Sequence, residues 1–244
     1  MEELKNKPQE MKIAVLIDGD NSSYQRVNEM LEEIAKYGVP TIKRIYGDFT
    51  KPNLEGWKTN LLDNAITPIQ QYAYTTGKNA TDSMMIIDAM DILYSKNVDG
   101  FCIVSSDSDF TRLAVRLREA GKFVIGMGEE KTPTPFIKSC DRFIYLSVIT
   151  RQKTQPTKLK LRDVKELKDM IQIAIDDVAD DSGYAFLADV GNIINKKHPD
   201  FDPRNYGYMK LSHLIKDLKD FVLDERPIGK SGVKHVYIKN RGEE

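Results

Sequence analysis

The sequence predicts an α/β domain built on a parallel sheet, followed by a small winged helix-turn-helix domain. In roughly the first 150 residues, short apolar runs alternate with segments of helical spacing, which is typical of β-α repeats. Arg151 to Arg162 then contains five basic residues, one proline and no acid, a linker composition. The remainder has three helical patterns and two short strands. We therefore expect domains at 11–148 and 163–240, joined by a basic linker at 149–162.

The elements of the first domain follow from apolar periodicity and from turn residues. Strands are expected at 12–17, 41–46, 69–74, 101–105 and 123–127, with a further edge strand at 143–146. Helices are expected at 22–37, 54–64, 82–95 and 111–120, and residues 128–139 read as a loop or a short helix. Gly38 ends the first helix, and Thr81 can cap the third. This β-then-α order favours a parallel sheet covered on both faces.

The second domain has a different pattern. Helices are expected at about 164–178, 187–196 and 206–220. Two strands follow at 222–225 and 234–238, with Gly229 and Gly232 between them. Three helices and a hairpin within a short chain segment indicate a winged helix-turn-helix.

Composition narrows the class of protein. The 244 residues are 41% apolar and 30% charged, with a net charge of −1, and neither half is strongly basic. Nucleic-acid binding would therefore need a local basic patch. The two cysteines, Cys102 and Cys140, predict neither a disulfide framework nor a cysteine zinc site. No apolar run is long enough to span a membrane, and the polar N-terminus lacks a signal-peptide core, so a cytoplasmic protein is expected.

Carboxylates follow the predicted strands. Asp18 ends the first strand, Asp107 and Asp109 follow the strand at 101–105, and Asp82 lies at the start of a helix. In open α/β sheets, ligands bind at the carboxyl edge, where these side chains would meet. Since all three histidines lie beyond residue 190, the donors of the first domain are oxygens, which favour Mg²⁺ or Mn²⁺ over zinc. Such ions support phosphodiester hydrolysis without a protein nucleophile.

Each acid also has a structural interpretation. An acid at a strand end, taken alone, more often caps a helix than binds a metal, and Asp109 could cap the helix beginning at Phe110. Asp20 could support the site or face the solvent. Asp88 lies six residues after Asp82, on another face of the helix, and is expected to be structural.

Three motifs in the first domain resemble the NYN domain, a branch of the PIN-like ribonucleases. They are VLIDGDN at 15–21, GKNATDSMMIIDAM at 77–90 and IVSSDSDFTRLAVRLREAGKFVIGMG at 103–128. The resemblance implies a Rossmann-like PIN fold and metal-dependent RNA cleavage. It makes Asp18, Asp82 and Asp107 metal ligands and adds Asp109 to the catalytic set. The supporting residues it implies are Asn21, Ser105 and Ser106.

Residues 163–239 resemble the LOTUS domain, also called OST-HTH. The matching residues include Gly183-Tyr184, Val190-Gly191 and the string from His198 to Tyr208. This family implies a winged helix that binds RNA or, in some members, a protein partner. Lysines meet phosphates and aromatic rings stack on unpaired bases, which gives a set of candidate RNA contacts. The set comprises Arg204, Tyr206, Lys210, Lys230 and Lys234, together with Lys78 and Arg112 of the first domain.

The leading hypothesis is a ribonuclease that uses Mg²⁺ or Mn²⁺ and holds RNA with its C-terminal module. The first alternative is a non-catalytic RNA-binding adaptor that keeps the acidic pocket without turning over. In the second alternative, the C-terminal module is a docking surface for a protein partner.

Overall fold

A computed structural model describes residues 10–72, 80–95, 97–150, 161–227 and 234–241. The chain divides into two compact units, Met1–Gln152 and Lys153–Glu244. Each unit has its own buried apolar core. The predicted α/β domain with a parallel sheet, followed by a smaller domain rich in helices, is confirmed.

The first unit is built on a six-stranded sheet in which every pairing is parallel. The strand order is β3-β2-β1-β4-β5-β6, so the chain builds outward from β1 in one direction and then from β4 in the other. The reversal lies between β1 and β4, and open α/β sheets bind ligands at the carboxyl ends of the strands at such a position. The strands are β1 (Lys12–Asp18), β2 (Val39–Gly47), β3 (Thr67–Gln70), β4 (Gly100–Val104), β5 (Phe123–Gly128) and β6 (Arg142–Tyr145).

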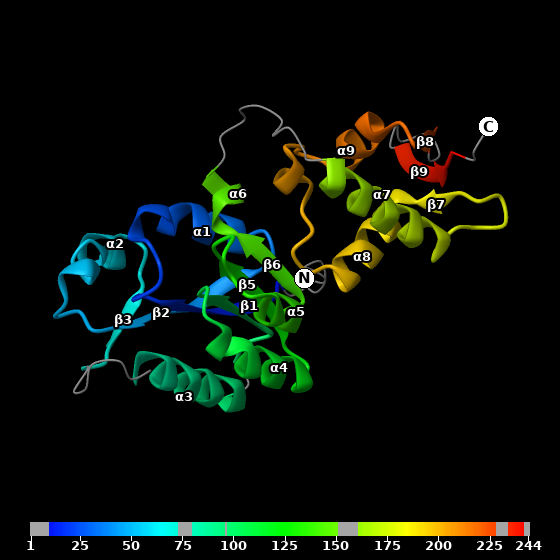
Figure 1. Ribbon diagram of the computed structural model, residues 1–244. Coiled ribbons are helices and arrows are strands. Elements are labelled where there is room, and N and C mark those ends of the chain that lie inside the picture. The colour runs from blue at the N-terminus through cyan, green and yellow to red at the C-terminus, as the bar shows by residue number, and fades with distance from the viewer. Residues whose placement is uncertain (1–9, 73–79, 96, 151–160, 228–233, 242–244) are drawn as a thin grey trace, which may run out of the picture. The chain divides into compact units, whose positions relative to one another are not determined.

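Helices cover both faces of this sheet (Figure 1). One face packs against α1 (Val27–Ile34), α2 (Trp57–Asp63) and α6 (Leu146–Thr150), where Ile17 and Trp57 share a core. The other packs against α3 (Ala80–Ser95), α4 (Thr111–Glu119) and α5 (Thr134–Ser139), where Leu16 and Met85 share a second core. Because β1 and β4 are buried on both sides, the runs 13–17 and 101–104 are apolar throughout instead of alternating with polar residues.

Short 3₁₀ turns and one edge strand depart from the predicted boundaries. The turns Tyr24–Arg26, Pro52–Leu54 and Ser108–Phe110 precede α1, α2 and α4. The strand predicted at 69–74 is observed as β3 at Thr67–Gln70. Pro68 lies inside β3, which its position at the edge of the sheet permits, since an edge strand leaves one side unpaired.

The described part of the second unit has three α-helices and a three-stranded antiparallel sheet of order β7-β9-β8. The helix predicted at 206–220 is replaced by a 3₁₀ turn at Pro203–Tyr206 and a separate helix, because Gly207 adopts a left-handed φ of 85° between them. The two-residue strand β7 was not predicted. The elements are α7 (Leu161–Asp176), β7 (Ala185–Phe186), α8 (Leu187–Lys197), α9 (Leu211–Leu218), β8 (Phe221–Pro227) and β9 (Lys234–Asn240).

No helix in the described ranges is both long enough and apolar enough to cross a membrane.

Candidate functional site

Asp18 anchors the acidic site at the end of β1. Its carboxylate is 1% exposed, and its Oδ2 accepts hydrogen bonds from the Ser105 hydroxyl at 2.7 Å and from Asn21 Nδ2 at 2.9 Å. The backbone N–H of Asn21 donates to Oδ1 at 3.3 Å. Burial raises the pKa of Asp18 although these hydrogen bonds favour its ionised form. The predicted supporting residues Asn21 and Ser105 thus fix the orientation of this carboxylate.

Gly19 makes the turn after Asp18 possible. Its N–H donates to the carbonyl of Tyr46 at 2.8 Å, which extends the pairing of β1 with β2 by one residue. A Cβ at Gly19 would lie 2.8 Å from that carbonyl oxygen and 3.1 Å from the Ile45 side chain. The turn that presents the acids therefore requires a glycine for close backbone approach.

The acidic turn after β4 is held by two serines. Ser105 also accepts a hydrogen bond from the N–H of Asp107 at 3.1 Å, so one hydroxyl links the turn to Asp18. The neighbouring Ser106 accepts from the N–H of Glu129 at 2.8 Å, which ties the turn to the end of β5. Asp107, and not Asp109, is the N-cap of the turn Ser108–Phe110, since its Oδ1 accepts from the N–H of Asp109 at 2.9 Å. The capping role considered for Asp109 therefore belongs to Asp107.

Asp82, Asp107 and Asp109 form the closest group of acids. Each offers one carboxylate oxygen, and these three oxygens lie within 4.8 Å of one another. Asp82 comes from the first turn of α3, whereas Asp107 and Asp109 come from the segment after β4. Asp18 is not one of the three, although its charge acts on Asp82. The structure thus brings together three of the four predicted catalytic acids and places Asp18 beside them.

The pKa of Asp82 is raised to about 6. Partial burial is the largest cause, followed by repulsion from Asp18, Asp107, Asp109 and Asp20. Crowded carboxylates resist ionisation together because each added negative charge is opposed by the others. A cation at this position would relieve that repulsion.

Asp20 contributes a fifth carboxylate. Its Oδ2 accepts a hydrogen bond from Thr81 Oγ1 at 3.0 Å, which joins the turn after β1 to the start of α3. Its Oδ1 is buried and accepts no hydrogen bond from any residue that the structure describes. A buried carboxylate oxygen without a donor is costly, so this atom is suited to a ligand. Asp20 therefore supports the site, and the alternative that it faces the solvent does not hold.

The donor set fits a hard divalent cation. Every candidate ligand is a carboxylate, the ligand that Mg²⁺ and Mn²⁺ prefer, and all histidines of the chain lie in the second unit. The unpartnered oxygen of Asp20 and the mutual repulsion at Asp82 agree with such an ion. The residues present therefore fit a divalent cation such as Mg²⁺ or Mn²⁺.

Two other acids of α3 have different environments. Asp88 accepts hydrogen bonds from Arg44 and from the Tyr46 hydroxyl, both on β2, and is structural as expected. Asp91 is exposed on the outer side of the helix.

The predicted RNA contacts of the first unit are only in part described. Lys78 lies outside the described residues. Arg112 is exposed in the first turn of α4, and it forms no ion pair with another described residue. Further along α4, Arg118 pairs with Asp141 at 2.8 Å, and Arg116 donates a hydrogen bond to the Tyr94 hydroxyl at 3.5 Å. Arg112 is the arginine of α4 that lies closest in sequence to the acidic turn.

The predicted RNA contacts of the second unit lie in different environments. Arg204 forms a two-pronged ion pair with Asp202, at 3.0 and 2.7 Å. Tyr206 is partly buried and packs against the core, with its ring centroid 6.0 Å from that of Phe201. Lys234 pairs with Glu225 at 3.1 Å. Lys210 is exposed at the N-cap of α9, and Lys230 lies outside the described residues. Of these candidates, Lys210 is the most available cation.

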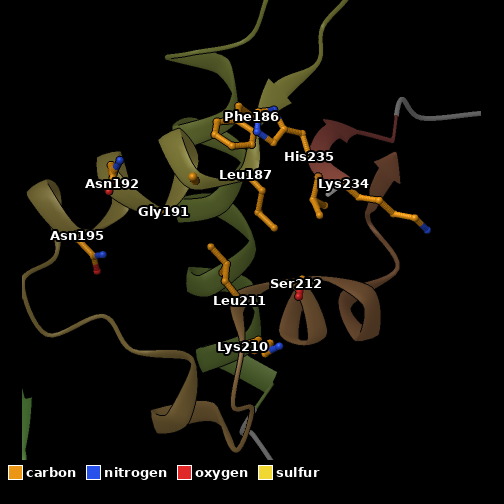
Figure 2. Close-up of a pocket in the computed structure, with 12 residues that line it drawn as sticks. Phe186, Leu187, Gly191, Asn192, Asn195, Lys210, Leu211, Ser212, Lys234 and His235 are labelled. Atoms are coloured by element: carbon orange, nitrogen blue, oxygen red, sulfur yellow. The ribbon is translucent and has the colours of Figure 1, made fainter. Parts of the chain in front are cut away.

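An open pocket of about 520 Å³ adjoins Lys210, and the sequence did not predict it. It lies among α8, the start of α9 and the start of β9 (Figure 2). A glycine inside a predicted helix, Gly191, was the one signal that could have indicated it.

Two family models match the chain in succession. The model for the NYN domain matches residues 12–147, and the model for the OST-HTH/LOTUS domain matches residues 161–233. An uncharacterized protein of Methanocaldococcus jannaschii is 28% identical over 133 residues, which are 53% of this chain and 52% of that protein. The chain thus spans about half the length of this relative.

Three solved structures show partial similarity. A protein of unknown function from Vibrio parahaemolyticus is 20% identical, with a TM-score of 0.47 over 57% of this chain and 95% of that chain. An uncharacterized protein from Nitrosomonas europaea is 35% identical, with a TM-score of 0.30 over 39% of this chain and 86% of that chain. A protein from Chromobacterium violaceum is 38% identical, with a TM-score of 0.28 over 37% of this chain and 91% of that chain. At these TM-scores, none of the similarities by itself defines a fold.

Proposed function

Because the chain belongs to the NYN domain family and carries an OST-HTH/LOTUS domain after it, we propose that it is a metal-dependent ribonuclease whose second unit holds RNA. The observation that carries this proposal is the convergence of oxygens from Asp82, Asp107 and Asp109 within 4.8 Å. Membership of the PIN-like nuclease superfamily supports the reaction class, and the LOTUS domain supports an RNA-related role.

Asp82, Asp107 and Asp109 would hold Mg²⁺ or Mn²⁺. When bound, such an ion lowers the pKa of an attacking water and offsets charge on the leaving oxygen of a phosphodiester. Hydrogen bonds from Ser105 and Asn21 hold the carboxylate of Asp18 in one orientation. Its negative charge therefore lies at a fixed position beside the three acids. These four carboxylates are the proposed catalytic set.

The surrounding residues position these acids. Ser105 sets the distance between Asp18 and the turn of Asp107, and Ser106 holds the same turn to β5. Thr81 and Asp20 hold the first turn of α3, from which Asp82 extends. Arg112 lies on the helix directly after the acidic turn, where its guanidinium can bind an RNA phosphate.

Cleavage of end-labelled RNA tests this proposal. The wild-type chain should cut single-stranded or structured RNA in Mg²⁺ or Mn²⁺ and not in EDTA, and Asp82→Asn should lower the rate by about 100-fold or more. Asp91→Asn, an exposed aspartate on the same helix, is the matched control and should cut at the wild-type rate.

Cleavage by Asp82→Asn and Asp107→Asn at the wild-type rate would overturn the proposal. If all variants bind RNA and none cuts it, the non-catalytic adaptor replaces the nuclease. The fragment ladder separates internal cleavage from removal of end nucleotides.

A further inference from the structure

The pocket of the second unit combines three elements that are distant in sequence (Figure 2). Leu187 at the start of α8 and Leu211 at the start of α9 point toward each other across it, and Val236 of β9 adds a third apolar side chain. Polar side chains line the same space, and none of the twelve lining residues is acidic. The polar lining residues are Asn192, Asn195, Lys210, Ser212, Lys234 and His235.

Phe186 and His235 form an aromatic wall of the pocket. Their ring centroids are 4.6 Å apart, with planes tilted by 39°. A flat heteroaromatic group can stack on such rings. Asn192 and Asn195 line the pocket further along α8, away from these rings (Figure 2). The two rings suit a nucleobase.

The rim of the pocket favours an anion. Phe186 and Lys210 are the N-caps of α8 and α9, and neither side chain has an acceptor for the N–H groups of the following turn. Uncapped helix starts attract negative charge, and the ammonium group of Lys210 adds to this field. Lys234 contributes less, because its ammonium group points away from the pocket and pairs with Glu225 (Figure 2). The start of α9 is therefore the favoured position for a phosphate.

Gly191 keeps the pocket open. A glycine inside a helix costs about 1 kcal/mol relative to alanine. Outside the backbone of its own helix, the one described atom within 4 Å of a Cβ at Gly191 would be Leu211 Cδ2, at 3.4 Å, an ordinary contact distance. Packing therefore does not demand a glycine here. The missing side chain leaves space between α8 and α9, which is the space that a ligand would fill.

We propose that this pocket binds one unpaired nucleotide of an RNA strand, with the base against Phe186 and His235 and a phosphate at Lys210 and the start of α9. The proposal rests on the RNA role given above and adds the mode of recognition. The bases of a duplex are paired and stacked, so their faces cannot enter such a pocket. The second unit would then select single-stranded segments.

The test uses the full chain carrying Asp107→Asn, so that RNA is not cut during the measurement. Fluorescence anisotropy gives the affinity for labelled single-stranded oligouridine and oligoadenosine, for a duplex of equal length, and for competing free UMP and AMP. The single strands should bind at least about tenfold more tightly than the duplex or the mononucleotides.

Two further substitutions locate the binding. Gly191→Leu should weaken single-strand binding about tenfold while the melting temperature stays equal or rises, because leucine favours the helix and fills the pocket. Lys210→Ala should lower the slope of log Kd against log salt by about 0.7, the value for one phosphate contact to a single strand. Lys196→Ala, which removes an exposed lysine from the last turn of α8, is the control and should change the slope less.

Several outcomes would overturn the proposal: unchanged affinity in a folded Gly191→Leu variant, equal salt slopes for the two lysine variants, or equal binding of duplex and single strands. Mononucleotides that bind as tightly as the strands would make the pocket a small-molecule site instead. If the parent chain binds no RNA, the nucleotide-binding proposal is wrong. The cleavage assay with the wild type still tests the ribonuclease proposal separately. If the parent chain binds single strands through the pocket and the wild type does not cut RNA, the ribonuclease proposal is wrong and the nucleotide-binding proposal is kept.

Discussion

At the scale of single residues, the acidic site depends on Asp82 and on the negative charges of Asp18, Asp20, Asp107 and Asp109, which act on it. The apolar runs and the acids that follow them identified Asp18, Asp82, Asp107 and Asp109, because strand ends of a parallel sheet share one edge. The sequence could not show that Asp109 joins Asp82 and Asp107 in one group of acids while Asp18 lies beside this group. That arrangement depends on how the turn after β4 folds. Likewise, the pairing of Lys234 with Glu225 depends on the register of the hairpin.

Asp82 is expected to destabilise the metal-free fold. The pKa of Asp82 in the folded state, about 6, exceeds the ordinary value of 3.8. The folded state therefore holds this proton more tightly than the unfolded state does, and the free energy of unfolding falls as pH rises through 6. Asp82→Asn should therefore raise the melting temperature in EDTA at about pH 7.5 by roughly 2–4 °C, which corresponds to about 1 kcal/mol after discounting for solvent screening. The gain should shrink toward about pH 4, where aspartate is protonated in the folded state.

Thermal melts of Asp82→Asn and of the exposed control Asp91→Asn, across pH and with or without Mg²⁺, check this prediction. Mg²⁺ should stabilise the wild type more than Asp82→Asn, because binding to the folded state alone adds to stability. A lower melting temperature for Asp82→Asn in EDTA at neutral pH would contradict it.

At the scale of elements, α3 carries two aspartates with opposite roles. Its first turn presents Asp82 to the acidic group, while Asp88 in its middle binds Arg44 and Tyr46 of β2. Helical periodicity predicted that these acids occupy different faces, because six residues do not complete two turns at about 3.6 residues per turn. It could not identify the partners on β2. It also missed β7 and the break at Gly207, since a two-residue strand has no readable period and a single glycine does not mark every helix end.

Asp88→Ala should destabilise the first unit by about 2–4 kcal/mol, because it leaves Arg44 and the buried Tyr46 hydroxyl without their acceptor. Burial and the bond to Asp88 both raise the pKa of Tyr46, so this hydroxyl remains a donor at neutral pH. Urea unfolding should show a smaller loss for Asp88→Asn, whose amide oxygen can still accept from Tyr46. Equal stability of Asp88→Ala and the wild type would contradict the structural role. The same type of change is thus expected to have opposite signs at two sites of one helix.

At the scale of the whole molecule, the acidic group and the pocket lie in separate units. The acidic group uses only residues of Met1–Gln152, and the pocket uses only residues of Lys153–Glu244. The sequence predicted this division from the change in element pattern on either side of the basic stretch at 151–162. The shape of the pocket could not be predicted from the sequence, because it depends on the distance between α8 and the start of α9.

A chain that ends at residue 152 should retain metal-dependent cleavage and lose affinity for RNA. Because the acidic site is complete within this unit, kcat should change by less than about threefold, whereas KM for single-stranded RNA should rise by about tenfold or more. Steady-state kinetics against the full chain measure both values, with the Mg²⁺-dependent shift in melting temperature as the check on folding. An unchanged KM would show that the second unit does not hold the substrate.

The parallel order of the sheet also has a kinetic consequence. Asp18, Asp82 and Asp107 come from segments separated by more than sixty and by more than twenty residues, and they meet only when β1 has paired with β4. Such distant contacts form late, since the entropy of closing long loops must be overcome first. An ion held by Asp82, Asp107 and Asp109, with Asp18 beside them, would find no complete site in a partly folded chain. Mg²⁺ should therefore slow unfolding and leave the rate of folding almost unchanged.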